Sequence, residues 1–525
     1  MINILEYLEE TLKQMPDQNK VAFASDGSEL TFCELSQRSR ACGSYIANHD
    51  INKQPVAVFM QKSPSMIAAF LGVVYSGNYY IPLDSEMPAF RIRLILESVK
   101  PSLIICDDVT SNLISKQDMS FPYSCQVINF NVTCNYAVNE AALANIRQNA
   151  IDADPLYIVF TSGSTGIPKG VVATHRSVID YIENLSAVLD VSANTIFGNQ
   201  SPLYLDACLK EVYTTLKFGA SAYLIPQSLF MFPVKLIEYI NDKGINTICW
   251  VASALSLVAG LGALKAAIPK TLHTIAFGSE VFPIKHYNLW RETLPDARFI
   301  HLYGPTEATG MSCFYEVMRT YDAEESIPIG HPFPNTEIIL LDDEDKIPQD
   351  GHQGEICIRG TCLSPGYFGD QEKTSTAFVQ NPLSVFPDII YKTGDLGRRG
   401  SDGELYYISR RDHQIKHMGH RIELAEVELV ANDCDIIGLA CAVFDDTDSH
   451  IVLYYVVSES VASEDADEAT NKKMKSAVRS YLKKNLPRYM LPHSIFQLEN
   501  LPHTPGGKID RVKLLEQYKA ERNKH

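Results

Sequence analysis

Hydrophobic positions in the first 400 residues form short apolar runs that alternate with longer amphipathic stretches. The runs at 56–60 (VAVFM), 102–106 (SLIIC), 245–251 (INTICWV), 273–278 (HTIAFG) and 297–304 (ARFIHLYG) are typical of buried strands. Stretches of helical period, about 10–15 residues long, lie between them. Short strands separated by helices predict an α/β fold, with parallel or mixed sheets sandwiched by helices.

The pattern changes near residue 400. Residues 398–414 (RRGSDGELYYISRRDHQ) contain a tight glycine turn followed by a basic cluster. The rest reads as a β-hairpin, a helix, two strands at 438–444 and 450–457, and a further helix, whereas the polar, acidic segment 457–473 predicts a loop. We therefore expect a large N-terminal domain over 1–410 and a small, mobile α+β domain over 411–525.

Composition and charge limit which partners the protein is expected to bind and in which cellular compartment it is expected to function. The formal net charge of −17 opposes binding to nucleic-acid phosphates or anionic lipid. The twelve cysteines show no CxxC pair and no spacing typical of zinc ligands. The first fourteen residues form an acidic amphipathic helix and not a signal peptide, and no 18-residue apolar run could span a membrane. These features predict a cytoplasmic monomer with no nucleic-acid or membrane partner.

A glycine-rich loop interrupts the apolar run that begins at residue 157. The segment 161–170 (TSGSTGIPKG) combines three glycines, four hydroxyl side chains and a lysine. Such a loop can turn sharply and offer backbone N–H groups, hydroxyls and a positive charge to a polyphosphate. It is not a Walker A loop, because Gly170 and not Ser or Thr follows the lysine. The alternative is a surface turn rich in small residues. The candidate ATP-binding residues are Thr161, Ser162, Gly163, Ser164, Thr165, Gly166 and Lys169.

This loop resembles the signature of the adenylate-forming superfamily, which includes amino-acid adenylation domains of nonribosomal peptide synthetases, acyl-CoA and aryl-CoA synthetases, and luciferases. Further segments resemble the family's other motifs in the same order: 302–310 (LYGPTEATG), 391–397 (YKTGDLG), 409–428 (SRRDHQIKHMGHRIELAEVE) and 501–511 (LPHTPGGKIDR). The resemblance covers nearly the whole chain. It implies ATP-dependent activation of a carboxylic acid, with Mg²⁺.

The resemblance assigns roles to residues that bind the nucleotide. Tyr303 would pack on adenine, Thr306 would contact the α-phosphate and Glu307 would help to hold Mg²⁺. Asp395 would accept hydrogen bonds from both ribose hydroxyls, which suits a carboxylate with two oxygens, and Arg410 would reach the ribose. His301 stands where amino-acid adenylation domains usually have an asparagine that contacts adenine, and could donate a hydrogen bond similarly.

The C-terminal motifs imply catalysis and movement. Lys508 would bridge the substrate carboxylate and the α-phosphate during attack, so it is the principal catalytic candidate, with Thr306 and Glu307. Asp412 would be the hinge of the mobile domain. Lys416 and Gly419 would line the path of an incoming thiol.

The segment 197–220 resembles the part of amino-acid adenylation domains that binds the substrate. Asp206 falls where the family binds the α-ammonium group, although an aspartate that caps the following helix is the alternative. Counting from the motifs, the side-chain pocket would consist of Ala207, Lys210, Ser253, Ile275, Phe277, Leu302, Gly310 and Met311. Lys210 could bind an acidic side chain, or it could pair with Asp206 and close the pocket around a small substrate.

The resemblance therefore implies a stand-alone amino-acid adenylation enzyme. It would form aminoacyl-AMP, release pyrophosphate and transfer the aminoacyl group to the phosphopantetheine thiol of a separate carrier protein. Residues 277–309 are also similar to D-alanine–carrier protein ligases. An acyl- or aryl-CoA ligase is a further alternative, against which Asp206 counts. A non-catalytic scaffold that binds nucleotide is another, and the presence of Lys508 and Glu307 counts against it.

Overall fold

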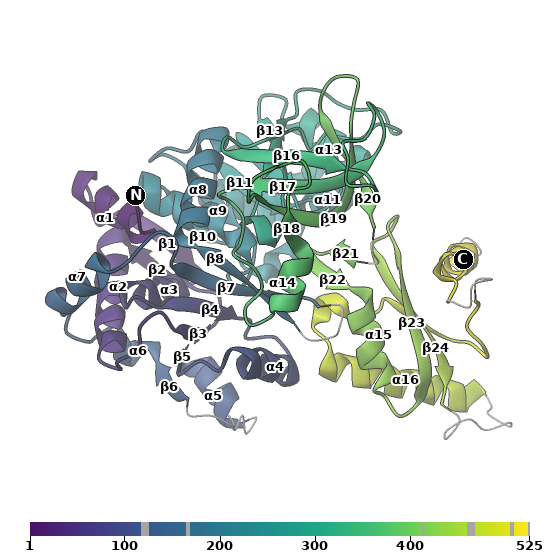
Figure 1. Cartoon of the computed structure of the whole chain (residues 1–525), viewed down its shortest axis with the longest axis horizontal. Coiled ribbons are helices and arrows are strands. Elements are labelled where there is room, and N and C mark those ends of the chain that lie inside the picture. The colour runs from purple at the N-terminus through teal and green to yellow at the C-terminus, as the bar shows by residue number, and fades with distance from the viewer. Residues whose placement is uncertain (117–124, 164–167, 412–413, 459–467, 504–508, 523–525) are drawn as a thin grey trace. The chain divides into compact units, whose positions relative to one another are not determined.

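The computed structural model describes residues 1–116, 125–163, 168–411, 414–458, 468–503 and 509–522 (Figure 1). Two compact units divide the chain. The first comprises residues 1–85, 96–160 and 170–411, and the second comprises 86–95, 161–169 and 412–525.

A nine-stranded mixed sheet forms one layer of the first unit. Its order is β15-β14-β13-β12-β11-β9-β10-β1-β2, and the strands from β13 to β1 run parallel. β11 and β12 are buried along their whole length, as expected for continuous apolar runs between helices. The strands are β1 (Val21–Ser25), β2 (Ser28–Thr31), β9 (Ile196–Asn199), β10 (Ser221–Leu224), β11 (Thr247–Val251), β12 (Thr274–Gly278), β13 (Arg298–Tyr303), β14 (Cys313–Glu316) and β15 (His331–Pro332).

A six-stranded sheet forms a second layer, in the order β6-β5-β3-β4-β7-β8. Its strands are β3 (Pro55–Phe59), β4 (Tyr79–Leu83), β5 (Leu103–Cys106), β6 (Gln126–Asn129), β7 (Pro155–Thr161) and β8 (Lys169–Thr174). β3, β4 and β5 pair in parallel and are fully buried. Gly170 allows β8 to pack closely, because an added Cβ would lie 2.8 Å from a methyl carbon of Ile158.

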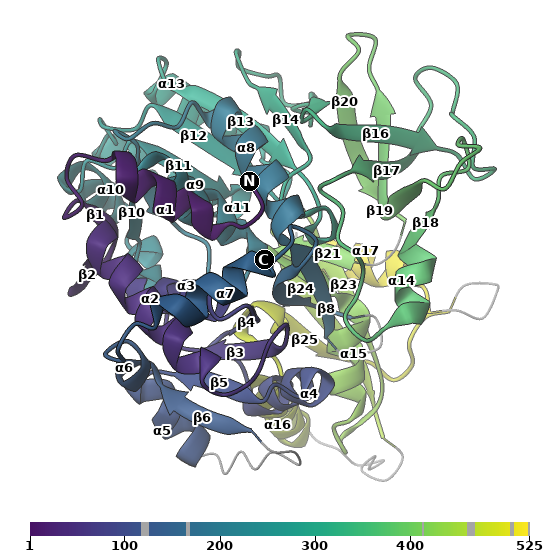
Figure 2. The same ribbon diagram turned by 60° about the vertical axis from the view of Figure 1, so that its left-hand side comes forward.

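One hydrophobic core joins these two sheets to the helices α1, α2, α3, α8 and α9. Figure 1 shows α8 and α9 beside β10 and β11, and Figure 2 shows α1 beside α9. Local signals fix the helix ends: Thr31 and Thr174 form capping boxes at the starts of α2 and α8, and Gly219 ends α9 in the left-handed conformation.

A second core covers the other face of the nine-stranded sheet, beneath α10, α11 and α13. The helices up to this point are α1 (Leu5–Gln14), α2 (Phe32–Ala47), α3 (Pro64–Tyr75), α4 (Ala89–Val99), α5 (Asp108–Lys116), α6 (Phe130–Thr133), α7 (Glu140–Gln148), α8 (His175–Leu189), α9 (Leu209–Phe218), α10 (Pro233–Asp242), α11 (Ala252–Gly260), α12 (Ala263–Ala266) and α13 (Ile284–Thr293), with short 3₁₀ turns η1 (Asp206–Cys208), η2 (Gln227–Met231) and η3 (Thr306–Ala308).

The first unit ends in an antiparallel sheet of five strands and one short helix. Its order is β16-β17-β19-β18, and β20 pairs with β19. The elements are β16 (Thr336–Leu341), β17 (Gly354–Gly360), α14 (Gln371–Ala377), β18 (Phe378–Gln380), β19 (Ile389–Arg399) and β20 (Leu405–Arg410).

The second unit contains the hairpin β21–β22 and a three-stranded sheet, β23-β24-β25. α15 and α16 share a core with one face of this sheet, and α17 shares a core with the other. The elements are β21 (Gln414–His417), β22 (His420–Glu423), α15 (Leu424–Asn432), β23 (Ile437–Asp445), β24 (His450–Val457), α16 (Glu468–Asn485), η4 (Arg488–Met490), β25 (Ser494–Gln497) and α17 (Arg511–Arg522).

Two sequence predictions can be compared with these elements, the loop at 457–473 and the cysteines. The loop predicted over 457–473 is wrong at its C-terminal end, because α16 begins at Glu468; residues 459–467 lie outside the described ranges. All twelve cysteines are free thiols, and nine of them are buried. In the described part of the chain, no helix combines the length and apolarity that crossing a bilayer requires.

Candidate active site

The predicted phosphate loop follows a buried strand. β7 ends at Thr161, and Thr161 and Ser162 are almost fully buried. The Thr161 hydroxyl has no hydrogen-bond partner among the described residues, so it retains a donor for a ligand. Lys169 opens β8 after the loop. Ser164, Thr165 and Gly166 lie outside the described residues.

Two predicted nucleotide ligands, Tyr303 and Arg410, converge on the carboxylate of a third, Asp395. The Tyr303 hydroxyl, at the end of β13, donates to Oδ2 of Asp395 at 2.6 Å, and Nη1 of Arg410 donates to Oδ1 at 2.5 Å. The Asp395 and Arg410 side chains are only 3% and 9% exposed. Burial and the nearby Asp395 charge raise the pKa of Tyr303 well above its usual value. The carboxylate is therefore oriented through both of its oxygens, by one side chain from β13 and one from β20.

His301 precedes this group on β13 and stacks on Phe277, with ring centroids 5.0 Å apart. Its Nδ1 lies 2.7 Å from the carbonyl oxygen of Pro328, which can only accept a hydrogen bond. In the neutral ring Nδ1 is thus the donor to this carbonyl. That His301 donates a hydrogen bond to adenine stays a prediction.

Glu307 lies in the 3₁₀ turn η3 and is fully buried. Its Oε1 accepts a hydrogen bond from Tyr367 at 2.7 Å. Gly304 lets the turn fold back, because a Cβ there would lie 2.5 Å from the Gly310 carbonyl oxygen. Tyr367 was not singled out from the sequence, although it lies in a segment, 354–368, that weakly resembles a family motif.

Asp206 and Thr306 meet although a hundred positions separate them in sequence. Asp206 lies in η1, and burial raises the pKa of its carboxyl, whereas a hydrogen bond with Thr306 and the charge of Lys210 lower it. α9 begins after Cys208 without a side-chain cap, so the alternative in which Asp206 caps this helix is wrong.

Lys210 and Glu211, in the first turn of α9, are 4% and 0% exposed. Burial raises the pKa of Glu211 to about 7, against the opposing charges of Lys210 and Lys62. Burial likewise lowers the pKa of Lys62 to about 8. Lys62 and Glu211 were missed from the sequence. Lys62 could have been identified from the sequence, because it follows the carboxyl end of the buried parallel strand β3, and ligands bind at that end of the strands in α/β sheets.

The eight pocket residues counted from the motifs do not share one environment. Leu302 and Met311 belong to the core that contains α8 and α9, whereas Ile275 and Phe277 face the opposite core beneath α13. On β12 it is Ala276 that faces α8 and α9. The remaining positions are Ala207 in η1, Lys210 in α9, Ser253 in α11, whose N–H donates to Glu280, and Gly310, whose φ is +89°.

The predicted thiol path and hinge belong to the second unit. β21 and β22 form a hairpin whose turn consists of Met418 and Gly419, with φ of 53° and 78°. Two successive positive φ values are typical of a tight two-residue hairpin turn. Lys416 lies on β21, opposite Arg421. Asp412 and the catalytic candidate Lys508 lie outside the described residues.

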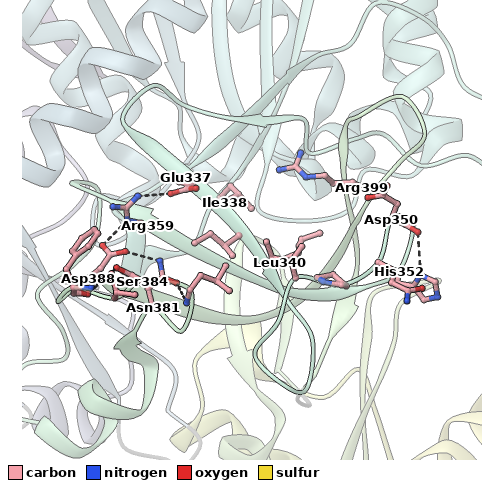
Figure 3. A pocket seen from close by; sticks show the side chains of 18 residues that line it. Glu337, Ile338, Leu340, Asp350, His352, Arg359, Asn381, Ser384, Asp388 and Arg399 are labelled. Atoms are coloured by element: carbon pink, nitrogen blue, oxygen red, sulfur yellow. Dashed lines mark hydrogen bonds and ion pairs between the residues drawn. The ribbon is translucent and has the colours of Figure 1, made fainter.

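A surface hollow of about 490 Å³ lies elsewhere in the first unit (Figure 3). It is formed by β16 and the loops 347–352 and 381–388. Arg359 closes one end through ion pairs with Glu337 and Asp388, both at 2.8 Å. The residues that line it include none of the candidate ATP or amino-acid ligands.

The comparisons with known proteins agree with the motifs. Residues 8–368 match the family model "AMP-binding enzyme". The chain is 28% identical to bacitracin synthase 1 of Bacillus licheniformis over 99% of its own length, but it spans only 10% of that protein, and it spans 13% of tyrocidine synthase 2 of Brevibacillus parabrevis. It is 29% identical to a D-alanine–D-alanyl carrier protein ligase of Bacillus cytotoxicus, covering 99% of this chain and 100% of the relative.

Solved structures share the architecture. The crystal structure of IdnL1 superposes with a TM-score of 0.78 at 25% identity and covers 95% of this chain and 99% of that one. The amide bond synthetase McbA from Marinactinospora thermotolerans superposes with a TM-score of 0.82 at 19% identity, covering 98% and 99%, and at that identity it supports the fold alone. With a family model that spans more than half of its length, the chain belongs to the AMP-binding enzymes, a family of adenylate-forming ligases.

Proposed function

We propose that this enzyme uses ATP to activate an amino acid as aminoacyl-AMP and then transfers the aminoacyl group to the phosphopantetheine thiol of a separate carrier protein. The observation that carries the amino-acid assignment is Asp206, a carboxylate hydrogen-bonded to Thr306 within the nucleotide motif. A carboxylate at this place matches the ammonium group of an amino acid. An acid without an amine would leave it without a counter-charge.

Each side chain of the site has a task in this reaction. Asp395, oriented by Tyr303 and Arg410, would accept the two ribose hydroxyls. Asp206 would hold the α-ammonium group, so that the substrate carboxylate faces the α-phosphate beside Thr306. Lys508 would neutralise the charge that develops as the carboxylate oxygen attacks the α-phosphorus and pyrophosphate leaves.

The fit of a magnesium ion can be judged from the donor set. No cluster of three or more His, Cys, Asp or Glu side chains able to hold a metal occurs within the described ranges. Mg²⁺ in nucleotide sites binds one or two carboxylates together with substrate phosphates, and the single buried carboxylate of Glu307 meets that requirement. The cation would offset phosphate charge, and Tyr367 would hold the Glu307 carboxylate in position.

Amino-acid-dependent ATP–pyrophosphate exchange tests the proposal. We expect exchange with one or a few of the proteinogenic amino acids and their D-enantiomers, and none with fatty or aryl acids. Exchange with fatty or aryl acids alone would contradict the proposal and favour a CoA ligase. Transfer is tested separately, by mass spectrometry of phosphopantetheinylated carrier proteins incubated with the enzyme, ATP and the preferred amino acid.

A D-alanine–carrier protein ligase is a second candidate, because the chain matches such a relative over that protein's full length. D-Alanine is therefore included among the amino acids of the exchange assay, and a D-alanyl carrier protein among the carrier proteins of the transfer assay. Preference for D-alanine over every other amino acid would support this candidate.

A further inference from the structure

Lys210 is a buried cation with no direct partner among the residues that the structure describes. Its side chain is 4% exposed, and among the described residues its Nζ forms no ion pair within 4.0 Å and no hydrogen bond. The expected alternative, in which Lys210 pairs with Asp206, is therefore not realised as a contact. An ammonium group taken out of water is costly unless an anion or several acceptors meet it. A ligand that brings an anion would remove this cost.

The neighbouring carboxyl of Glu211 is hydrogen-bonded through one oxygen only, because its Oε1 has no partner among the described residues. Oε2 of Glu211 accepts a hydrogen bond from Asn199 at 3.3 Å. Lys62 approaches the same region, donating to the carbonyl oxygens of Asn199 and Gln200 at 3.3 and 3.2 Å. Lys62 and Lys210 thus both act on Glu211, which burial already keeps partly protonated near neutral pH. The charge of Lys210 also acts on Asp206, the carboxyl proposed to hold the α-ammonium group. With Asp206 engaged by that group, Glu211 is the one of these two carboxyls that remains for the two ammonium groups.

Two buried tyrosines add unused donors to the same place. The hydroxyls of Tyr157 and Tyr181 have no hydrogen-bond partner in the described part of the chain. Burial raises the pKa of both phenols, and the charge of Asp206 adds to the rise in each. The Tyr181 ring also lies against Gly310, where an added Cβ would come within 2.8 Å of its carbons. Buried hydroxyls are normally paired, so these two indicate a polar ligand.

We propose that the activated amino acid has an acidic side chain, and that Lys210 pairs with its carboxylate while the Tyr181 hydroxyl donates to it. This inference rests on the proposed function, because Asp206 must hold the α-ammonium group. Asp206 lies in η1 and Lys210 one helical turn later, so the two opposite charges lie on the same side of this segment and can each meet a charged group of one small molecule. A carboxylate can accept hydrogen bonds from several donors at once.

Substrate pairs that differ only in charge test the inference. ATP–pyrophosphate exchange by the wild-type enzyme is measured with glutamate, aspartate, glutamine, asparagine and alanine, each as the L- and the D-enantiomer. We expect kcat/KM for the preferred acid to exceed that for its amide at least 100-fold. In Lys210→Met, kcat/KM for the acid should fall at least 100-fold and that for the amide less than tenfold. Lys217→Met is the matched control on α9, since Lys217 pairs with Glu183 near the surface, and it should leave the ratio unchanged.

A binding measurement keeps the test independent of whether the variant folds. Calorimetric titration of the wild-type enzyme with glutamyl- and glutaminyl-sulfamoyl adenosine, and with the aspartyl and asparaginyl pair, should give at least 100-fold tighter binding of one acidic analogue. Equal affinities within both pairs, or preference for alanine or an amide in exchange, would overturn the acidic assignment while leaving amino-acid activation intact. Absence of exchange with every amino acid would instead refute the proposed function.

Discussion

Two buried carboxylates at the site are held by tyrosine hydroxyls. Tyr303, expected to stack on adenine, also donates to Asp395, and Tyr367 donates to Glu307. Both acceptors are buried carboxylates with low exposure. Hydrogen bonds to charged groups are worth more than neutral ones, about 1.5–3 kcal/mol each. Two tyrosines thus orient the carboxylates that we propose to bind the ribose and Mg²⁺.

Removal of the Tyr303 hydroxyl should weaken nucleotide binding. In Tyr303→Phe the Asp395 carboxylate loses one of its two protein donors, so it is less well oriented for the ribose. We expect the Kd for a non-hydrolysable ATP analogue to rise about tenfold, in keeping with a charged hydrogen bond of ~1.4 kcal/mol. Calorimetric titration measures it. Tyr315→Phe, on the neighbouring strand β14, is the control, and an equal effect of both changes would count against the orienting role.

The ionisation of Glu211 should make stability depend on pH. The pKa of its carboxyl is raised from 4.5 to about 7, chiefly by burial. Between these values the folded protein holds a proton that the unfolded chain has released, so stability falls as the pH rises from 4.5 to 7 and then levels off. A shift of this size corresponds to ~3 kcal/mol.

Glu211→Gln cannot ionise, so it should escape this loss. Relative to the wild type, the variant's free energy of unfolding should rise by up to ~3 kcal/mol between pH 5 and pH 8. Urea unfolding at both pH values measures this difference, with the exposed Glu29→Gln as control. A difference that stays constant with pH would contradict ionisation of Glu211 in this range.

At the scale of elements, local signals predicted the parallel strands well. The apolar runs at 245–251, 273–278 and 297–304 became β11, β12 and β13, because continuous burial demands uniformly apolar residues. The order of the strands and the antiparallel sheet β16–β20 did not follow from the sequence, since pairing is set by contacts between distant segments. The start of α16 at Glu468 was hidden by an acidic composition that is equally typical of loops.

The same dependence on contacts between distant segments explains why part of the predicted side-chain pocket was wrong. Counting from motifs located the residue types but not their faces: on β12 a shift of one residue moves a side chain across the sheet, and Ala276 rather than Ile275 or Phe277 faces α9. The sequence assigned no role to Tyr181 or Glu211. Both are buried, and the Tyr181 hydroxyl and Glu211 Oε1 have no hydrogen-bond partner among the described residues, which makes them candidates.

The attachment of α17 can be tested as a single element. Arg511, at its first position, donates to Glu428 at 2.5 and 3.0 Å and to the Ala442 carbonyl at 2.6 Å. Its side chain is 24% exposed and that of Glu428 is 14% exposed. We expect Arg511→Ala to destabilise the second unit by ~2 kcal/mol, since a partly buried ion pair is broken. Hydrogen exchange of the α17 amides should accelerate, whereas Lys513→Ala, an exposed change on the same helix, should leave it unchanged. Equal exchange in both variants would contradict the role of Arg511.

At the scale of the whole molecule, the two units have separate hydrophobic cores. The core that joins the two large sheets draws its residues from positions 4–333, whereas the cores around β23 and β24 draw theirs from positions 422–518. Asp206, Tyr303, Glu307 and Asp395 all belong to the first unit, whereas Lys508 belongs to the second. The residues proposed to bind the substrates and the residue proposed to catalyse the reaction therefore belong to different units.

This division predicts that binding and chemistry can be separated by truncation. The fragment 1–411 keeps the carboxylates proposed to bind ribose, Mg²⁺ and the α-ammonium group, but it lacks Lys508. We expect it to fold and to bind an aminoacyl-sulfamoyl adenosine within tenfold of the full chain in calorimetric titration. Its ATP–pyrophosphate exchange should fall at least 10³-fold, because charge stabilisation at the transferring group supplies several kcal/mol of the barrier reduction.

Full-length Lys508→Ala separates loss of this ammonium from loss of the entire unit. If Lys508 carries the chemistry, the point variant should bind the analogue as the wild type does and lose exchange as severely as the fragment. If the variant keeps most of its exchange while the fragment loses it, the second unit contributes through other residues, and the catalytic assignment of Lys508 fails. Retained exchange in the fragment would instead place all the chemistry in the first unit, beside Thr306 and Glu307.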